Sequence, residues 1–557
     1  MSNRALPVCA CRWCSCPMPQ PKPRFRASGR LTDNRSLDNL PLSSVPFRLV
    51  HNSDPRPQVP DMGSMGMLVG AVVLLAILHR AYLAVYRLYL SPLSTIPGPK
   101  LWAISSIPYH ATTIRGNMHL RLLDFTKKYG PTVRVSPDHV AFTSPQAFKD
   151  IYAGTTKTAF PVNPIYYNAP INAVHSLVTA PADNHARQRR HFAPGFSKES
   201  LHAQEAVIKR YVDHLMQRLS TEAQTGPVAI SDWFNSFTFD LTSELLFSES
   251  FECLSSGRLH PWITLLFGSI KGMVYVSAVK CFPALDWALM KMMPQRLIDM
   301  QRDHFDLSAA KADRRIELGS RKADLLSPVL KNGVGEVHGL HVEEKRLSRE
   351  ELHSNAYIFI VAGSETTGTA LAGITYYLCK NPTTLTTLLS EVRSSFKSAD
   401  DITIDTATKL PYLDAVIREG LRIYPPFAAG NHRVAPKGGD YVDGHFVPEG
   451  THLYGYHYAL YHSPAYFALP SEFRPERWLG TDARFAEDQL DAVRPFGLGL
   501  RMCIGQILAW AELRLVLCNM LYRFDVKLRP ECEKWIEQDL FYLWQKSSLV
   551  VELHSRE

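Results

Sequence analysis

Near its C-terminal end the chain reads FGLGLRMCIG, from Phe496 to Gly505, and this stretch decides the fold. Glycines stand on both sides of Cys503, where they allow tight turns and close approach of the backbone to a flat ligand. The next segment, 506–521 (QILAWAELRLVLCNML), has apolar residues at helical spacing. A thiolate just before a helix N-terminus is stabilised by the unpaired amides and the helix dipole. The stretch therefore predicts a loop that brings a cysteine thiolate to a metal.

Five spaced residues of this stretch resemble the haem-cysteine signature of the cytochrome P450 family, Phe-x-x-Gly-x-Arg-x-Cys-x-Gly. Every fixed position is matched, by Phe496, Gly499, Arg501, Cys503 and Gly505. The alternative is that Cys503 is a small buried hydrophobe, as most free cysteines are. A chance match at all five positions is rare for a chain of this composition, so we favour the resemblance. It implies that Cys503 is the axial ligand of the iron of haem b.

Length and charge limit the classes of protein that remain. The chain has 557 residues, 46% of them hydrophobic, which is enough for a large core. The formal net charge is +8, but residues 1–61 hold nine Lys and Arg against four Asp, so only +3 remains for the rest. We therefore expect no nucleic-acid partner. Six of the ten cysteines are scattered along the chain, which suits a reducing compartment without a disulfide framework.

The N-terminal region changes character at Met62. Residues 1–61 are rich in Pro, Arg and Ser and are expected to be a disordered basic tail. That tail is either an extension added by the gene model or an Arg-rich mitochondrial presequence. Its cysteine cluster lacks a histidine at ligand spacing, so a metal site there is disfavoured. Residues 62–90 are apolar and predict a transmembrane anchor rather than a buried soluble helix, because a proline-rich hinge, 91–100, follows them.

If the chain begins at Met62, the positive charges that follow the anchor hold the body of the protein in the cytosol. The expected location is the endoplasmic reticulum membrane, with a single span and a cytosolic catalytic domain, 101–557. Within that domain we expect one long helix, 346–378, and strands around 131–143 and 438–458. The fold class that the resemblance and the pattern indicate is mainly α with small β-sheets, in one large domain.

The long helix carries AGSETT, residues 362–367. Glycine costs about 1 kcal/mol against alanine inside a helix, so Gly363 is expected to mark a close approach, and it would leave room for dioxygen over a haem. Thr366 can bond a main-chain carbonyl and loosen the helix. By resemblance to the acid-threonine pair of the family, Glu365 and Thr366 are the expected catalytic residues: the Thr366 hydroxyl would hold the iron-bound oxygen, and Glu365 would bring protons inward. A helix kink with a solvated Glu365 is the alternative.

Two further motifs match the family. Glu419 and Arg422 lie three residues apart, a spacing that usually means a surface ion pair. The resemblance instead places them with Arg477 of FRPERW in a buried structural triad. For the haem propionates, the family supplies cations that match Arg501, Arg433 and Arg189. His185 stands where the family has Trp, and the imidazole could also donate to a propionate.

Other basic and aromatic residues suggest where partners bind. Arg187 and Arg190 are expected to form a solvated basic face, where an acidic reductase could dock. The recognition regions of the family correspond to four segments that are aromatic or small and carry few charges, which suits a bulky apolar substrate. Single residues in them, such as Phe359 and Trp544, could equally belong to the core. The segments are Phe160–Pro170, Phe359–Ala362, Pro426–Gly430 and Phe541–Trp544.

The stretches 356–378 and 471–480 are similar to fungal monooxygenases of secondary metabolism, the group of the isotrichodermin and averantin hydroxylases. The resemblance implies a membrane-anchored haem-thiolate monooxygenase that inserts one oxygen atom from O2 into a hydrophobic terpenoid or polyketide. Electrons from NADPH would arrive through a separate NADPH-cytochrome P450 reductase, since no flavin-binding region is evident. The alternatives are a haem-thiolate isomerase or dehydratase, against which Glu365 and Thr366 argue, and a non-enzymatic haem-binding protein.

Overall fold

The structure is a computed structural model that describes residues 62–556, except 156–157, 168–170, 259, 283–285, 289–290, 293–294, 320–323 and 336–345. The expectations for the basic tail, its cysteine cluster and the end of the first recognition segment at Pro170 therefore lie outside the described residues. The chain divides into two compact units, Met1–Ala71 and Val72–Glu557.

The first described element is the apolar helix α1, Met62–Val85. A π-helical turn, Tyr86–Leu90, continues it. The mainly apolar span Met65–Leu90 has 26 residues, and about 20 are needed to cross a bilayer. By length and composition, this helix fits a single-pass membrane anchor. The proline-rich segment that follows forms a 3₁₀ turn, Pro92–Thr95, whose first turn the Ser91 side chain caps.

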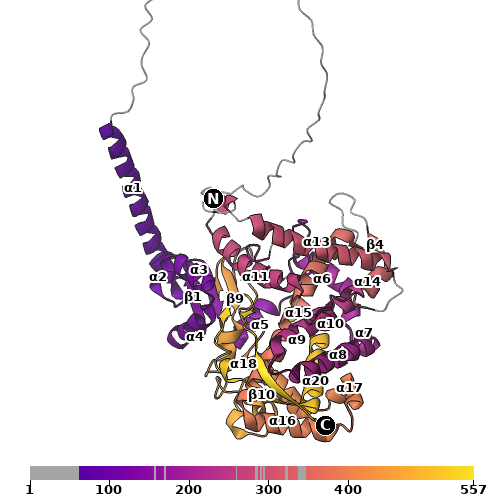
Figure 1. Cartoon of the computed structure of the whole chain (residues 1–557). Coiled ribbons are helices and arrows are strands. Elements are labelled where there is room, and N and C mark those ends of the chain that lie inside the picture. The colour runs from indigo at the N-terminus through magenta and orange to yellow at the C-terminus, as the bar shows by residue number, and fades with distance from the viewer. Residues whose placement is uncertain are drawn as a thin grey trace, which may run out of the picture. The chain divides into compact units, whose positions relative to one another are not determined.

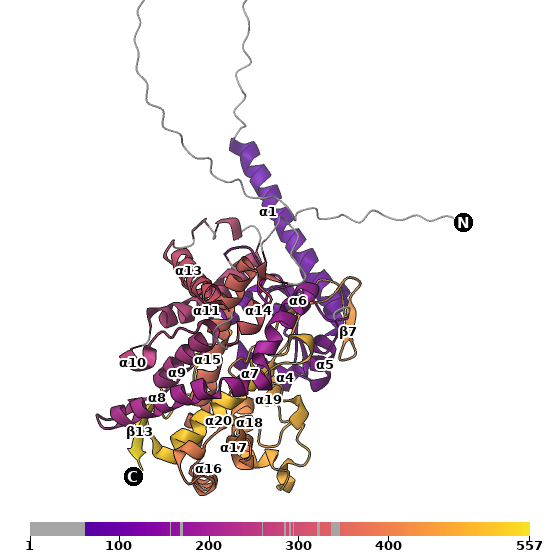
Figure 2. The ribbon, with the colours of Figure 1, turned by 90° about the vertical axis from the view of Figure 1, so that its right-hand side faces the viewer.

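The second unit is built mainly of helices (Figures 1 and 2). The longer ones are α3 Ile107–Ile114, α4 Met118–Tyr129, α5 Pro145–Tyr152, α6 Ala182–Phe192, α8 Glu205–Ala223, α9 Ile230–Phe247, α11 Pro261–Lys280, α13 Gln295–Glu317, α15 Arg349–Lys380, α16 Pro382–Ser395, α18 Pro411–Ile423 and α20 Gln506–Arg523. Shorter helices are α2 Lys100–Ile104, α7 Lys198–Ala203, α10 Cys253–Ser256, α14 Ser327–Lys331, α17 Ile404–Ala407 and α19 His457–Tyr461.

The strands form small sheets. One has the order β1-β2-β9-β6, from Thr132–Ser136, His139–Phe142, His452–Gly455 and Arg433–Val434. Another has the order β10-β13-β3, from Phe524–Leu528, Val550–Ser555 and Val228–Ala229. Two-stranded pairs are β4-β5 (Val334–Gly335, Leu347–Ser348), β7-β8 (Asp440–Val442, His445–Val447) and β11-β12 (Asp539–Leu540, Trp544–Gln545). The predicted fold class, mainly α with small β-sheets, is confirmed.

Helix α15 is the central element of this unit and contacts α9, α13, α18 and α20 (Figure 1). It begins at a capping box in which Ser348 and Glu351 bond each other's main-chain amides, at 3.1 Å in both directions. The predicted long helix is confirmed, with its start and its end each displaced by two or three residues. It is α-helical from Arg349 to Lys380.

Glycines bring α9 and α15 close together. A Cβ on Gly363 would lie 2.8 Å from the side chain of Thr242, and one on Gly368 would lie 2.6 Å from Asn235 Oδ1. The space beside Gly363 is therefore filled by Thr242 of α9. The expectation that Gly363 leaves room for dioxygen is corrected here, because its missing side chain makes a helix–helix contact possible instead.

Candidate active site

The loop Phe496–Gly505 connects to the N-terminus of α20 and is closed by its own main chain. The Cys503 amide donates to the Phe496 carbonyl at 2.8 Å, around a 3₁₀ turn at Gly499–Arg501. Gly499 has a φ of 71°, and a Cβ there would lie 2.1 Å from the Tyr152 carbonyl oxygen. Only glycine fits this position. Gly505 has an ordinary φ, and a Cβ there would meet only Cys503 Sγ, at 4.0 Å.

Cys503 combines exposure with desolvation. Its side chain is exposed, yet burial raises the pKa of its thiol, against the opposing effects of the Gly505 amide and Arg189. The thiol is thus open to solvent on one side, while the protein atoms around it cause the desolvation. The expected stabilisation of the thiolate by the helix N-terminus is thus outweighed by burial. A metal ion bound to sulfur would reverse this balance, since a coordinating thiol is deprotonated.

Arg501, which is half-buried, and Arg433, which is buried, lie near each other. Burial and the like charge of Arg433 lower the pKa of Arg501 to about 10. The Arg501 guanidinium donates to the Ala180 carbonyl at 2.5 Å, and Arg433 donates to the His432 carbonyl at 3.0 Å. Among the described residues, neither arginine pairs with a carboxylate. Two neighbouring cations, the buried Arg433 and the half-buried Arg501, fit an anionic group such as the two propionates of haem.

Arg189 and His185, both on α6, contact the cysteine loop through its carbonyls. Arg189 donates to the Met502 carbonyl at 2.7 Å. The two ring nitrogens of His185 lie 2.7 Å from the Leu177 carbonyl and 3.1 Å from the Leu500 carbonyl. Both nitrogens are thus engaged by the main chain, and His185 ties α6 to the loop. Phe496 lies at the base of the loop, with its ring 6.3 Å from that of Trp510.

The two predicted catalytic residues of α15 face different surroundings. Thr366 is half-buried and its hydroxyl donates to the Ala362 carbonyl at 2.7 Å, on a face where Ala362 is exposed. Glu365 is buried and forms an ion pair with Lys546, which the sequence did not suggest. Burial raises the pKa of Glu365, and the Lys546 ammonium opposes the shift. The alternative of a solvated Glu365 is therefore wrong.

Glu419 stands at the centre of a buried network. Arg422 donates to its two oxygens at 2.7 and 2.9 Å, and Arg477 Nε lies 3.1 Å from Oε1. The Arg474 amide and the Trp478 indole each donate to it at 2.9 Å. The carboxylate is thus saturated with donors, and the Arg422 charge and the hydrogen bonds keep its pKa low in spite of burial. The structure brings the three predicted members of the triad together and adds Trp478 from the same FRPERW stretch.

The expected basic face is only partly present. Arg187 is buried and pairs with Glu351 at the start of α15, while Arg190 is exposed. The prediction that Arg187 is solvated is wrong, because its position on α6 faces α15 rather than water.

In the recognition segments, aromatic residues pack against the protein itself. The Phe359 ring lies 5.0 Å from that of Phe192, in the core. Trp544 is buried, donates to the Pro425 carbonyl at 2.8 Å and stacks on Tyr424. The Tyr166 ring stacks on His432 with centroids 3.8 Å apart. The core alternative therefore describes Phe359 and Trp544.

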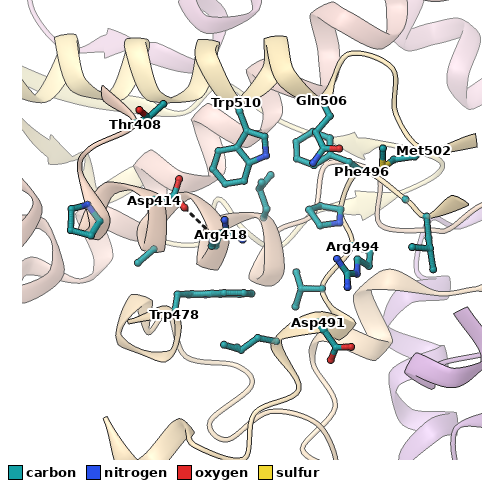
Figure 3. Close-up of a pocket in the computed structure, with 18 of the residues that line it drawn as sticks. Thr408, Asp414, Arg418, Trp478, Asp491, Arg494, Phe496, Met502, Gln506 and Trp510 are labelled. Carbon is teal, nitrogen blue, oxygen red and sulfur yellow. Dashed lines mark hydrogen bonds and ion pairs between the residues drawn. The ribbon is translucent and has the colours of Figure 1, made fainter. Parts of the chain in front are cut away.

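A surface depression of about 850 Å³ adjoins the cysteine loop (Figure 3). It is lined by α18, the start of α20 and loop residues that include Met502, next to Cys503. Arg418 lies between two indoles, 5.4 Å from the Trp510 ring and 6.0 Å from that of Trp478, and pairs with Asp414 at 2.9 Å. Two further basic residues, Lys409 and Arg494, line the depression.

The family model for cytochrome P450 matches residues 96–551. The chain is 38% identical over 501 residues to a cytochrome P450 monooxygenase of Hormonema carpetanum, which covers 89% of this chain and 98% of that protein. It is 38% identical over 486 residues to trichothecene C-15 hydroxylase of Fusarium sporotrichioides, which covers 86% and 96%. It is 37% identical over 475 residues to averantin hydroxylase of Dothistroma septosporum, which covers 85% and 88%. The chain therefore belongs to the cytochrome P450 family and is a cytochrome P450 monooxygenase.

Proposed function

We propose that this enzyme inserts one atom of O2 into a hydrophobic intermediate of fungal secondary metabolism, a terpenoid or a polyketide. The electrons would come from NADPH through a separate NADPH-cytochrome P450 reductase. The observation that carries the chemistry is the Cys503 thiol in its closed loop, whose Arg501 lies near the buried Arg433, with neither arginine paired to a carboxylate among the described residues. The substrate class rests on the relatives, whose names describe hydroxylation of a trichothecene and of averantin.

Each residue of the site has a role that follows from its contacts. Cys503 would hold the iron of haem b, and Arg501 and Arg433 would bind the propionates. The loop residues Phe496, Gly499 and Gly505 would shape the cradle around the thiolate. Bound haem supplies the activation of dioxygen, and a thiolate ligand favours cleavage of the O–O bond.

Arg189 and His185 would act mainly on the loop, since both already bond its carbonyls. Their contacts to Met502 and Leu500 hold the turn that carries the cysteine. On α15, Thr366 would hold a proton at its Oγ1 on the open face of the helix. Glu365 would supply that proton from its carboxyl group.

The reductase would dock on the depression beside Met502 (Figure 3). This depression includes Met502, which directly precedes Cys503 in the sequence, and carries Lys409 and Arg494, which suit an acidic partner. Arg190 would add to the electrostatic attraction. The apolar helix α1 would anchor the enzyme in the endoplasmic reticulum membrane, with the catalytic domain in the cytosol.

Two measurements test the function. The carbon-monoxide difference spectrum of the reduced protein should show thiolate ligation, and Cys503→Ala should abolish it. A spectrum typical of imidazole ligation would overturn the assignment. Incubation with NADPH, reductase and ¹⁸O2 against panels of terpenoids and polyketides should then give a product heavier by one ¹⁸O atom. A product that forms equally well without O2 would indicate an isomerase instead.

A further inference from the structure

Glu365 and Lys546 form a buried ion pair across 181 residues of sequence. The exposed fractions of the two side chains are only 7% and 5%. Thr369 joins both of them, since its hydroxyl donates to Glu365 Oε1 at 3.0 Å and accepts from Lys546 Nζ at 2.6 Å. The carboxylate of the acid-threonine motif is therefore held by two groups, and Lys546 lies outside the motif.

Lys546 is placed by the hairpin β11-β12, which it directly follows. The Leu540 amide of β11 donates to the Gly116 carbonyl at 2.7 Å, and the Trp544 indole of β12 donates to the Pro425 carbonyl at 2.8 Å. These contacts fix the hairpin on both sides. The neighbours of Lys546 in sequence, Gln545 and Ser547, are exposed, so water lies one residue away from the buried pair.

Few other ionisable groups act on Glu365. Tyr424, which stacks on Trp544, is close enough for the charge of Glu365 to raise the pKa of its phenol, although burial is the larger cause. On the α20 side, Glu512 bonds Thr367, and burial raises the pKa of Glu512 to about 8. The α9 side chains that meet α15 here are uncharged, namely Asn235, Thr238 and Thr242. Among the groups described around Glu365, Lys546 is thus the cation.

We propose that Lys546 is a positioning residue for proton delivery, which favours the ionised form of Glu365 and holds its carboxylate turned away from Thr366 until a proton arrives. This inference rests on the proposed monooxygenase function. Glu365 takes a proton from the bulk solvent, relayed through water that enters beside the hairpin so that no hydroxide is left behind, leaves the ammonium group, and passes the proton toward Thr366. The carboxylate then returns to Lys546, so charge and protons balance over the cycle.

Loss of the Lys546 ammonium group should raise the pKa of Glu365. An opposite charge within about 4–6 Å lowers a carboxyl pKa by roughly one to three units, and burial alone raises it. In Lys546→Met the apolar stem remains but the charge is gone, so Glu365 stays protonated to higher pH. Lys546→Arg keeps a cation at this place.

The test uses the full chain in phospholipid nanodiscs with the reductase and NADPH, without added substrate. The measured quantity is the fraction of consumed O2 that is released as peroxide rather than reduced to water, as a function of pH. We expect the inflection of this profile to move upward by about one to three pH units in Lys546→Met, and to stay near the wild-type value in Lys546→Arg. Lys534→Met, at an exposed position ahead of the hairpin, is the matched control and should not differ from wild type.

A second readout does not depend on turnover. Infrared spectra at neutral pH should show a protonated carboxyl band in Lys546→Met that disappears when Glu365→Gln is added. If Lys546→Met does not fold, as judged by its carbon-monoxide spectrum, Lys546→Gln replaces it in both experiments. The proposal is overturned if Lys546→Met, or Lys546→Gln in its place, has the same pH profile as wild type. It is also overturned if the profile of Lys546→Arg moves as far as that of the uncharged variant. Failure of the proposed function is distinct, since the wild type itself would then lack the thiolate spectrum or NADPH consumption.

Discussion

Glu512 should make the enzyme lose stability as the pH rises toward neutrality. This residue lies on α20 and is only 2% exposed, and its Oε2 has no hydrogen-bond partner among the described residues. Burial raises the pKa of its carboxyl group to about 8, although a hydrogen bond from Thr367 opposes the shift. The side chain therefore stays protonated in the folded protein at a pH where it ionises in the unfolded chain.

The sign and size of the effect follow from linkage. Between the unfolded pKa and the folded pKa the native state binds more protons, so the free energy of unfolding falls as the pH rises. With an unfolded pKa of about 4.3 and a folded pKa of about 8, the loss between about pH 5 and pH 7.5 amounts to about 3 kcal/mol. Glu512→Gln cannot ionise, so this part of the pH dependence should vanish.

The assay is denaturant unfolding of the full chain in detergent at several pH values, followed by fluorescence. The informative quantity is the difference in unfolding free energy between Glu512→Gln and wild type, plotted against pH. If the amide itself changes the stability, it does so equally at every pH and does not alter the slope of this plot. This difference should grow in favour of the variant by about 3 kcal/mol from pH 5 to pH 7.5. Glu487→Gln, at an exposed position, provides the control. A difference that stays flat across this range would refute the reasoning.

Three further predictions concern the cysteine loop, the triad and the depression. Gly499→Ala should abolish the thiolate-type carbon-monoxide spectrum because its Cβ meets the Tyr152 carbonyl, whereas Gly480→Ala, with a similar φ and open space, should retain it. Glu419→Gln should lower the free energy of unfolding by about 3–5 kcal/mol, measured by denaturant titration, because the buried Arg422 loses its counter-ion and Arg477 keeps only Asp488. Reversing the charges of Lys409 and Arg494 to Glu should slow reduction by the reductase at low salt, with the difference shrinking at high salt, and with an unchanged carbon-monoxide spectrum.

Residues that sit in short motifs were the ones that could be predicted from the sequence. The cysteine loop is closed by the main-chain hydrogen bond from Cys503 to Phe496, so its conformation depends on ten consecutive residues. Glu419 and Arg422 lie on one face of α18, and their spacing suggested the pair. The apolar helix α1 could be predicted because a run of apolar residues is visible in the sequence without knowledge of its neighbours in space.

Contacts between distant segments could not be predicted in the same way. Lys546 is 181 residues from Glu365, and nothing near either residue points to the other. Arg187 stands among other basic residues and looked solvated, yet α6 packs it against Glu351. The role of Gly363 was misjudged for the same reason, since its neighbour Thr242 belongs to another helix. Sequence spacing shows which residues share a face of a helix. Which element packs against that face depends on the tertiary fold.

The geometry of a helix explains why the motif on α15 needs a residue from outside it. Successive residues are turned by about 100° in an α-helix with 3.6 residues per turn, so adjacent side chains cannot share a face. Gly363 therefore meets α9, Glu365 meets the C-terminal hairpin, and Thr366 lies on the open face. An acid next to a threonine in sequence must thus point away from it at rest, into whatever element packs there. In this chain that element carries Lys546, and the charge of the acid is controlled from the hairpin.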